Sequence, residues 1–579
     1  MRLLPVLIAA ASLAVRAEVS PPRPAHAIRA ARGARRLTDV AALPVTDPGA
    51  RLCYEGSIDR GQGNEDWNWG VYRDARGDWV LLEADGPGCI FNFVQHRYVT
   101  DCEAPVFRFY FEGESEPRLA ITPAEFGVRS PLLPPLAGVQ KWQGKWRHGP
   151  TDKLQDFSIV RSFVPMEFTN GVRITSSVRL HGGEPGGWGH VQYHLYPSAA
   201  GLATFDPSAD FAALARACER PLDAGHDATA DTPAGELAAG ASACLFERAG
   251  RGTVTAVSLA LPAFEQAQLT NLWLSLSFDG EERVRAPVGT FFGNEQSCIK
   301  NEADRTGYDF ETALLTFDLS RKGALRLENR FPMPFWRNAR IVLENRGAVP
   351  VRTGAVCVRT NSRLAYDRRT AGHFTATAYL PPTRNRRFRN AVLGQGVGCG
   401  HVVYSVITGH GFTEKACEGD VRLYLDNLAA PAAQSDGSES WGCWGMGFGH
   451  APKSHLFSFY NSPDRLGPWS LCRLNVTDAC PFRHVFRLEI EHGPDNLEER
   501  SSHSGQVFYY GRGNADRDGT ETPRAPSRPL EDIVDAAFAG HWKYGFSEKT
   551  SLLHGCPTNA VKPLSVRASA LEVVETEAR

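Results

Sequence analysis

Hydrophobic and polar residues alternate in several short runs along the chain. At residues 107–111, Phe107, Phe109 and Phe111 are separated by single, more polar neighbours, and at 272–278 leucine or phenylalanine occupies every second position. A period of two is typical of a β-strand with one buried face. Each run ends in an acidic residue followed by glycine, which indicates a turn. The pattern therefore predicts half-buried strands at both places.

The two runs belong to a longer internal repeat with a constant displacement of 167 positions. Three pairs of segments share this displacement: Glu112 and Asp279, Pro165–Phe168 and Pro332–Phe335, and Arg173–Ile174 and Arg340–Ile341. A repeat of this length indicates duplication of a whole domain. A further alternating run at 421–425, which ends at Asp426–Asn427, is assigned to the sheet of the second copy.

Many short strands separated by glycine and proline predict an all-β fold, a tandem double jelly-roll β-sandwich with minor helical appendages. Helical spacing occurs at 210–220, behind a possible cap at Ser208, and at 530–539. The predicted boundaries are a signal peptide at 1–17, an N-terminal linker at 18–49, a first jelly roll at 50–200, a partly helical connector at 201–250, a second jelly roll at 251–520 and a C-terminal extension at 521–579.

Composition narrows the class of protein. The net charge is −2, so there is no basic excess to neutralise nucleic acid or an acidic membrane. The apolar start at 1–17 is typical of a signal peptide cleaved near Ala17, although a buried N-terminal strand is the alternative. We expect a protein exported to the periplasm or the extracellular space, without a membrane span. Its 13 cysteines form no dense disulfide framework, and their pairing stays open.

The region from about 394 to 511 combines glycine, aromatic residues and carboxylates, as a carbohydrate-handling surface would. Aromatic rings can stack on sugars, and carboxylates can bind hydroxyl groups or transfer protons. A solvated acidic surface is the alternative. The segments concerned are Glu418-Gly419-Asp420, Asp436-Gly437-Ser438-Glu439, Trp441, Trp444 and Glu491-His492-Gly493.

Several motifs, taken in order, resemble the domain of unknown function 2961 family, now glycoside hydrolase family 172. They are Asp59–Asp66, Asp85–Gly88, the two acidic-Gly strand ends, Pro332–Phe335, Glu418–Asp420 and Glu491–Gly493. The resemblance spans about residues 50–512. It implies a double jelly roll, a homotrimer or hexamer with active sites near subunit interfaces, and exo-acting, anomer-retaining cleavage of α-D-arabinofuranosides or α-D-fructofuranosides.

The resemblance also implies two catalytic carboxylates. The nucleophile falls on Glu418 and the acid/base on Glu439, but Ser440–Gly442 departs from the residues that usually follow in the family. A retaining mechanism needs the two carboxyl groups about 5–5.5 Å apart. Glu418 precedes a strand and Glu439 follows it in a glycine-rich loop, so a hairpin-like return would bring them together.

Further residues are candidates for substrate binding or for supporting the site. The motif Asp59–Asp66 is either a sugar subsite or a polar turn. The tryptophans near Glu439 would contact the sugar, cover the carboxyl group of Glu439 or pack in the core. The substrate-binding candidates are Asp59, Asn64, Asp66, Trp67, Trp441 and Trp444. Glu491 and His492 either support the site from behind or form a structural ion pair.

Two other classes of function remain. No zinc-type histidine spacing occurs, so we expect no catalytic metal and no cofactor. A non-catalytic carbohydrate-binding or surface-assembly sandwich is the main alternative, because a jelly roll does not itself imply activity. A serine esterase is less well supported, because no G-x-S-x-G occurs in a strand-turn-helix context.

Overall fold

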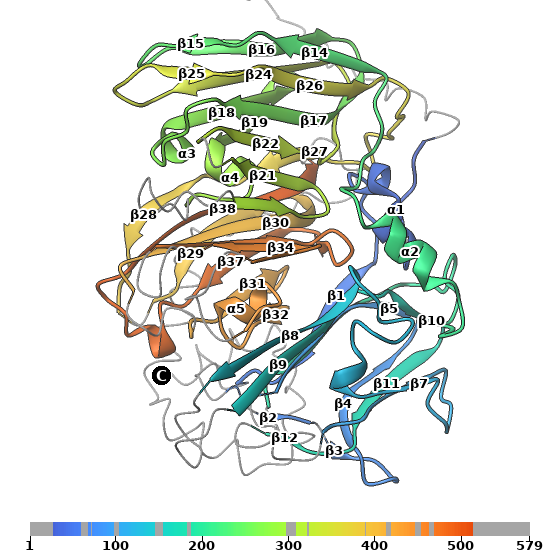
Figure 1. Cartoon of the computed structure of the whole chain (residues 1–579). Helices are drawn as coiled ribbons and strands as arrows, with labels where there is room; N and C mark the ends of the chain where they lie inside the picture. Colours follow the sequence, from blue (N-terminus) through green and yellow to red (C-terminus); the bar gives the residue numbers. More distant parts are fainter. Residues whose placement is uncertain are drawn as a thin grey trace, which may run out of the picture.

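The computed structural model describes residues 27–512, except 60–65, 67, 71, 98–103, 145–154, 182–186, 297–307, 321–322, 388, 413–417, 446–452 and 462–467. Antiparallel strands dominate these residues, and helices are short (Figure 1). The all-β sandwich class predicted from the sequence is thereby confirmed. The helices are α1 (Arg35–Thr38), η1 (Val40–Ala42), η2 (Pro123–Glu125), α2 (Phe211–Ala217), α3 (Gln268–Asn271), α4 (Val288–Phe291), α5 (Ser438–Trp441) and η4 (Pro494–Asn496).

The first sandwich contains strands β1 to β13. One sheet has the order β1 (Arg51–Gly56), β13 (Gly189–Leu195), β5 (Gly88–Arg97), β9 (Gln155–Ser162) and β8 (Ala137–Gly144), with β10 (Met166–Phe168) paired to β5. The other has the order β3 (Tyr72–Arg73), β4 (Trp79–Asp85), β11 (Gly171–Ser176), β6 (Phe107–Phe111) and β7 (Leu119–Ile121). A small ribbon joins β12 (Leu180–His181) to β2 (Asn68–Trp69). Phe93 of β5 packs edge-on against Phe107 of β6, so the two sheets enclose a core.

The second sandwich contains strands β14 to β26. Its larger sheet has the order β14 (Ala228–Thr232), β26 (Val356–Asn361), β17 (Gly252–Leu261), β22 (Leu325–Asn329), β21 (Leu315–Leu319) and β20 (Tyr308–Glu311), with β23 (Met333–Phe335) paired to β17. The facing sheet has the order β16 (Ser242–Ala249), β24 (Asn338–Asn345), β18 (Leu272–Phe278) and β19 (Glu281–Pro287). A ribbon joins β15 (Gly235–Leu237) to β25 (Val351–Thr353). Phe278 and Phe335 stack between the two sheets.

The third sandwich contains strands β27 to β38. Its larger sheet has the order β27 (His373–Ala376), β38 (Ser502–Arg512), β30 (Cys399–His410), β35 (Trp469–Leu474), β34 (Ser458–Asn461) and β33 (Lys453–His455). At its margins β28 (Leu380–Arg384) pairs with β38, and β36 (Cys480–Phe482) pairs with β30. The facing sheet has the order β29 (Ala391–Val397), β37 (Val485–Ile490), β31 (Val421–Leu425) and β32 (Ala433–Gln434). Phe486 and Tyr509 pack between these sheets.

The internal repeat extends to three copies, beyond the two predicted. Strands β6, β18 and β31 occupy equivalent places in the three sandwiches, and each is followed by an acidic residue with a left-handed backbone: Glu112 (φ 54°), Asp279 (φ 57°) and Asp426 (φ 60°). In each copy the carboxylate accepts backbone N–H bonds from the turn before a neighbouring strand, at Thr169 (2.6 Å), Arg337 (2.6 Å) and His484 (2.7 Å). These hydrogen bonds, shared by the three copies, stabilise a turn residue in a strained backbone conformation.

Three predicted assignments need correction. The connector at 201–250 contains β14, β15 and β16 of the second sandwich, and 251–520 spans parts of two sandwiches. The run at 421–425 belongs to the third copy, displaced by 147 positions (279 to 426), because the loops of the copies differ in length. Helix α2 is capped by Asp210, which accepts a bond from Ala213 N at 3.0 Å, and not by Ser208. The segments 1–17, 521–579 and the helix predicted at 530–539 lie outside the described residues.

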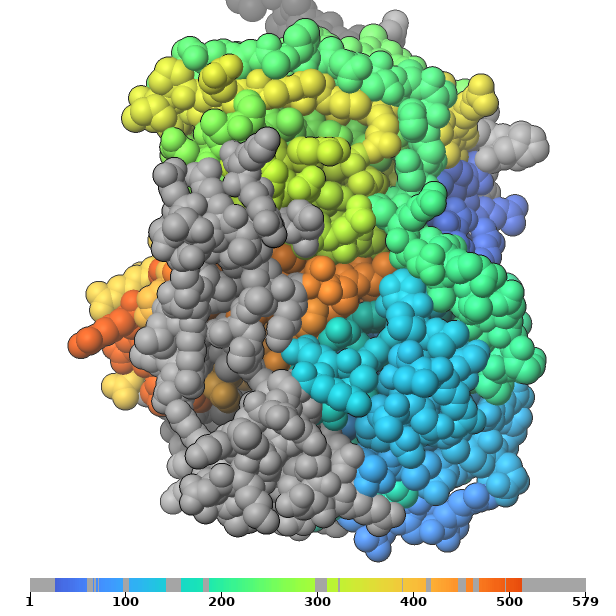
Figure 2. Space-filling model, viewed as in Figure 1, coloured from blue at the N-terminus to red at the C-terminus, as the bar shows by residue number. Residues whose placement is uncertain are grey.

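The third sandwich lies between the other two (Figure 1), and in the space-filling view it meets both directly (Figure 2). The turn after α4 packs on the third sandwich, where Tyr404 donates to the Phe291 carbonyl at 3.1 Å. The turn after α5 packs on the first, where Asn92 Nδ2 donates to Cys443 Sγ at 3.0 Å. In both cases a turn that follows a short helix packs on the neighbouring sandwich. The contact of the turn after α5 brings α5 and the sequence motifs around it to the junction of the first and third sandwiches.

Candidate functional site

The hairpin of β31 and β32 brings the two predicted catalytic carboxylates to one end of a sheet. Arg422 pairs with Gln434 in this hairpin, and Ser435 N donates to the Val421 carbonyl at 3.0 Å. Glu418 lies just before β31 and Glu439 lies on α5, just after β32. The hairpin return predicted from the sequence is present. Glu418 is exposed and Glu439 is partly exposed, so both are within reach of solvent.

Gly419 is required by the close approach of Glu491, the residue that follows β37. A Cβ atom on Gly419 would lie 2.2 Å from the Glu491 carbonyl oxygen, a distance that no side chain can accept. Next to it, Glu491 N donates to the Asp420 carbonyl at 2.9 Å. The Glu-Gly-Asp and Glu-His-Gly motifs therefore fold against each other as one unit, in which glycine allows the two backbones to touch.

A buried ion pair stabilises the place where the Glu-Gly-Asp and Glu-His-Gly motifs meet. Arg422 Nη2 lies 2.6 Å from Glu491 Oε1 and 3.7 Å from Asp420 Oδ2, and all three side chains are at most 2% exposed. Gln434 Nε2 donates to Asp420 Oδ2 at 2.7 Å. Burial, and then the charge of Glu491, raise the pKa of Asp420 well above its usual value, while Arg422 opposes the rise. Glu491 thus forms the ion pair considered from the sequence and also contacts the motif that carries Glu418.

His492 bonds to groups outside the cluster of Arg422, Glu491 and Asp420. Its Nε2 lies 2.8 Å from the Arg386 carbonyl, and its backbone N donates to Asn496 Oδ1 at 3.1 Å. Burial lowers the pKa of the ring below its ordinary value. His492 therefore ties β37 to the loop around Arg386, which is a structural contact.

The first sandwich supplies a second group of polar side chains to the site. Asp66 Oδ1 accepts a bond from Asp59 N at 2.5 Å, and both side chains are buried. Burial raises the pKa of Asp66 well above its usual value, and the nearby charges of Asp420 and Asp436 raise it further. The structure therefore brings Asp59 and Asp66 to the carboxylates of the third sandwich. The other two candidates of this motif, Asn64 and Trp67, lie outside the described residues.

Two residues at this junction were not predicted from the sequence. Ser57, just after β1, donates through Oγ to Asp436 Oδ2 at 2.6 Å. Asp436 lies three residues before Glu439, so its position in the Asp-Gly-Ser-Glu segment could have identified it as a site residue from the sequence. Ser57 carried no such signal, because its role depends on the docking of two sandwiches.

Trp441 and Trp444 pack in the core of the third sandwich and its junction with the first. They are 5% and 4% exposed, and their Nε1 atoms donate to Ser405 Oγ at 3.4 Å and Ser458 Oγ at 3.0 Å. Arg161 of the first sandwich lies 4.7 Å from the ring centre of Trp444. The predicted role of these rings as sugar-stacking surfaces is therefore wrong, and core packing, the alternative reading, is what the structure shows.

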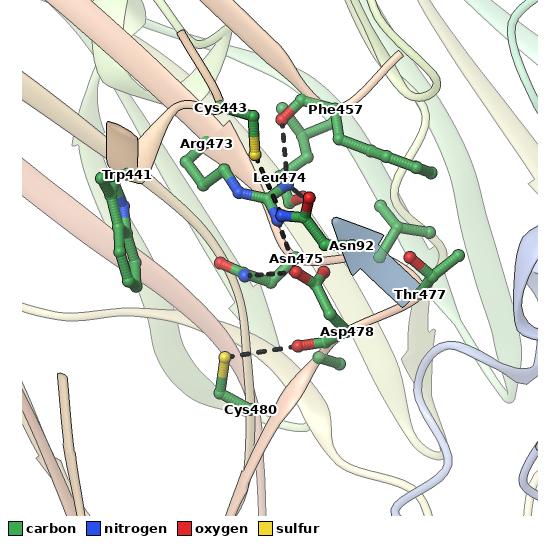
Figure 3. Close-up of polar contacts among 12 residues, drawn as sticks. Asn92, Trp441, Cys443, Phe457, Arg473, Leu474, Asn475, Thr477, Asp478 and Cys480 are labelled. Carbon is green, nitrogen blue, oxygen red and sulfur yellow. Dashed lines mark hydrogen bonds and ion pairs between the residues drawn. The ribbon is translucent and has the colours of Figure 1, made fainter. Parts of the chain in front are cut away.

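A buried polar cluster supports the turn after α5 (Figure 3). Arg473 Nη2 and Asp478 Oδ2 lie 2.5 Å apart with both side chains 2% exposed, and Arg473 Nη1 donates to the Leu474 carbonyl at 2.6 Å. In the same view Asn92 reaches Cys443, whose φ of 60° is unusual for a residue with a side chain. The turn that follows Glu439 is thus held in a strained conformation by fixed neighbours.

Within the described ranges, no group of three or more His, Cys, Asp or Glu side chains is arranged to hold a metal ion. The nine cysteines in this part of the chain are free thiols. No helix there is long and apolar enough to cross a membrane.

Comparisons with known proteins give one informative match. No curated protein matches the chain. Among solved structures, a chain of the T13 IBDV viral particle is 8% identical over 91% of this chain and 98% of its own, with a TM-score of 0.15. A chain of Infectious Bursal Virus derived T=1 particles is 8% identical over 90% of each chain, with a TM-score of 0.12. Residues 48–213 match the family model described as the GH172 first beta-sandwich domain, so this part of the chain is similar to the first sandwich of that glycoside hydrolase family.

Proposed function

We propose that this protein is an exported glycoside hydrolase that removes terminal α-D-arabinofuranosyl or α-D-fructofuranosyl groups with retention of anomeric configuration. The observation that carries the proposal is the common position of Glu418 and Glu439 at one end of the β31–β32 hairpin. The family match of the first sandwich supports the general class, and the resemblance of the motifs supports the choice of furanosides.

In this mechanism the two carboxyl groups do different work. Glu418, as a carboxylate, attacks the anomeric carbon while Glu439 gives its proton to the departing glycosidic oxygen. Glu439 then removes a proton from water, which attacks the glycosyl-enzyme and releases the sugar. The exposure of Glu418 suits a group that must meet substrate, and the partial burial of Glu439 suits one that must hold a proton.

The carboxyl groups around this pair are suited to binding hydroxyl groups. Asp66 has a raised pKa, so it retains its proton to higher pH than an ordinary aspartate. A protonated carboxyl group offers a donor as well as an acceptor, and a furanose ring presents both kinds of hydroxyl contact. We propose that Asp59 and Asp66 grip the sugar from the side of the first sandwich.

The test compares the wild type with Glu418→Gln and Glu439→Gln on a nitrophenyl α-D-arabinofuranoside, with a difructose anhydride as second substrate. We expect near-complete loss for Glu418→Gln, because no covalent intermediate can form. Glu439→Gln should retain turnover of the activated phenol and lose the natural linkage, and azide should partly rescue its second step. Glu247→Gln changes an exposed glutamate on β16 of the second sandwich and is the matched control.

The outcome distinguishes this proposal from the binding-module alternative. An inactive wild type that still binds the sugar would favour a non-catalytic carbohydrate-binding sandwich. Equal, wild-type-like rates in the Glu418 and Glu439 variants would contradict the assignment of both residues while leaving the enzyme class open.

A further inference from the structure

Ser57 is held rigidly at the end of β1. Its backbone N donates to the Gly189 carbonyl at 3.0 Å, and Gly189 N donates back to Ser57 Oγ at 3.1 Å. A Cβ on the preceding residue, Gly56, would lie 2.6 Å from the same carbonyl, so the two segments are in direct backbone contact. The serine side chain is therefore oriented by its own strand and by β13, with 1% exposure.

The hydroxyl of Ser57 reaches across to the third sandwich. Its Oγ lies 2.6 Å from Asp436 Oδ2 and 3.3 Å from the Gly189 carbonyl. A hydroxyl has one proton, and the shorter contact to a carboxylate is the stronger acceptor for it. The bond joins residues 379 positions apart in the chain.

Asp436 controls the entry into α5. Gly437 follows it with φ 124° and ψ 155°, a conformation that residues with side chains rarely adopt, and the helix begins at Ser438. Glu439 is in the first turn of this helix. At the other end of the helix, Asn92 of the first sandwich holds Cys443. The segment that carries Glu439 is thus attached to the first sandwich at both ends.

We propose that Ser57 and Asp436 are positioning residues for Glu439, so that the first sandwich sets the geometry of proton donation by a carboxyl group of the third. This inference rests on the proposed function of Glu439 as the acid/base. Neither residue is required to touch the reacting atoms. Their bond fixes the start of α5, and displacement of a catalytic group by about 1 Å is enough to cost roughly 100-fold in rate.

The experiment exploits the dependence of acid catalysis on the leaving group. Ser57→Ala removes the donor, and its turnover is measured on a dinitrophenyl and on a methyl α-D-arabinofuranoside. We expect kcat/KM, which reports the glycosylation step alone, to fall at least about 10-fold on the methyl glycoside, which needs a proton, and by less than about 3-fold on the dinitrophenyl glycoside. Ser275→Ala, which breaks a 2.5 Å serine–glutamate bond in the second sandwich, is the matched control.

Two further variants separate positioning from general damage. Asp436→Asn keeps an oxygen that accepts the Ser57 bond and should retain activity on the methyl glycoside, whereas Asp436→Ala should resemble Ser57→Ala. The double variant of Ser57 and Asp436 to alanine should be no worse than either single variant, because both act through one bond. Thermal unfolding confirms that each variant is folded.

Equal losses of Ser57→Ala on both glycosides, or no loss on either, would overturn the positioning role while leaving Glu439 as the acid/base. A wild type that hydrolyses neither glycoside would overturn the proposed function and this inference with it. A strictly additive double variant would show that the two residues act separately, which also contradicts the proposal.

Discussion

Acid should destabilise this fold through histidines buried near the junction of the first and third sandwiches, and His401 offers the clearest test. Burial, reinforced by the charges of Arg36 and Arg512, lowers the pKa of His401 to about 3. Its Nε2 lies 2.7 Å from the Leu43 carbonyl and its Nδ1 lies 3.2 Å from Thr46 Oγ1, so the neutral ring is well satisfied. A second proton on this ring would meet the like charges of Arg36 and Arg512 in a buried place.

The direction and the size of this pH effect follow from the linkage between proton binding and folding. The folded pKa is below the unfolded value of about 6.5, so the unfolded chain binds more protons, and the contribution to stability is present above pH 6.5 and lost as pH falls towards 3. At pH 5 the difference of about 1.5 pH units costs about 2 kcal/mol. His190, whose pKa burial also lowers to about 3, adds a similar cost. Together they cost about 4 kcal/mol, which is close to the lower end of the usual stability of a domain, about 5–15 kcal/mol.

The assay compares wild type with His401→Gln by urea unfolding at pH 8 and at pH 5. Buried carboxyl groups with raised pKa values, such as Asp66 and Glu295, gain relative stability over the same interval, but they do so equally in both proteins. The loss of unfolding free energy between the two pH values should therefore be about 2 kcal/mol smaller in the variant. His226→Gln, at an exposed histidine, is the control and should match wild type. An identical pH dependence in wild type and His401→Gln would refute the reasoning.

Three other outcomes are expected. Gly419→Ala should abolish the proposed glycosidase activity and lower the unfolding free energy by about 1–3 kcal/mol, because its methyl group would overlap the Glu491 carbonyl; wild-type kinetics and urea midpoint would contradict this. Arg422→Met should destabilise by about 3–5 kcal/mol, since it leaves Glu491 and Asp420 buried without their cation, and adding Glu491→Gln should recover part of the loss in the same urea titration. Light scattering at micromolar concentration should find a trimer or hexamer, and a monomer alone would remove the idea of sites shared between subunits.

The sequence by itself determined the strand class and two copies of the repeat. The runs at 107–111 and 272–278 are β6 and β18, because a period of two buries one face of a strand wherever the strand lies. The hairpin relation of Glu418 and Glu439 was also predictable, since it depends on only 21 residues of local chain (418 to 439). Features set by short-range periodicity and turn chemistry can be read from residue order alone.

The third copy was not recognised from the sequence because its residues have diverged while its backbone conformation has not. Where the second copy has Pro332–Phe335, the third has Ala479–Phe482, and loops of different length shift the displacement to 147 positions (332 to 479). The left-handed φ of Asp426 and the N–H bonds to its carboxylate reveal the equivalence. Many different side chains are compatible with one backbone geometry. The geometry of a repeat is therefore retained after the sequence similarity between its copies has been lost.

Only the tertiary structure decided which residues meet at the site. Trp441 and Trp444 have the composition of a sugar platform, but both rings are buried: Trp441 bonds to Ser405 within the third sandwich, and Trp444 packs beneath Arg161 of the first. Ser57 and Asp436 are joined by one hydrogen bond across 379 positions of chain. Such contacts depend on how two whole sandwiches pack against each other, and packing is a property of complementary surfaces that no local pattern of residues contains.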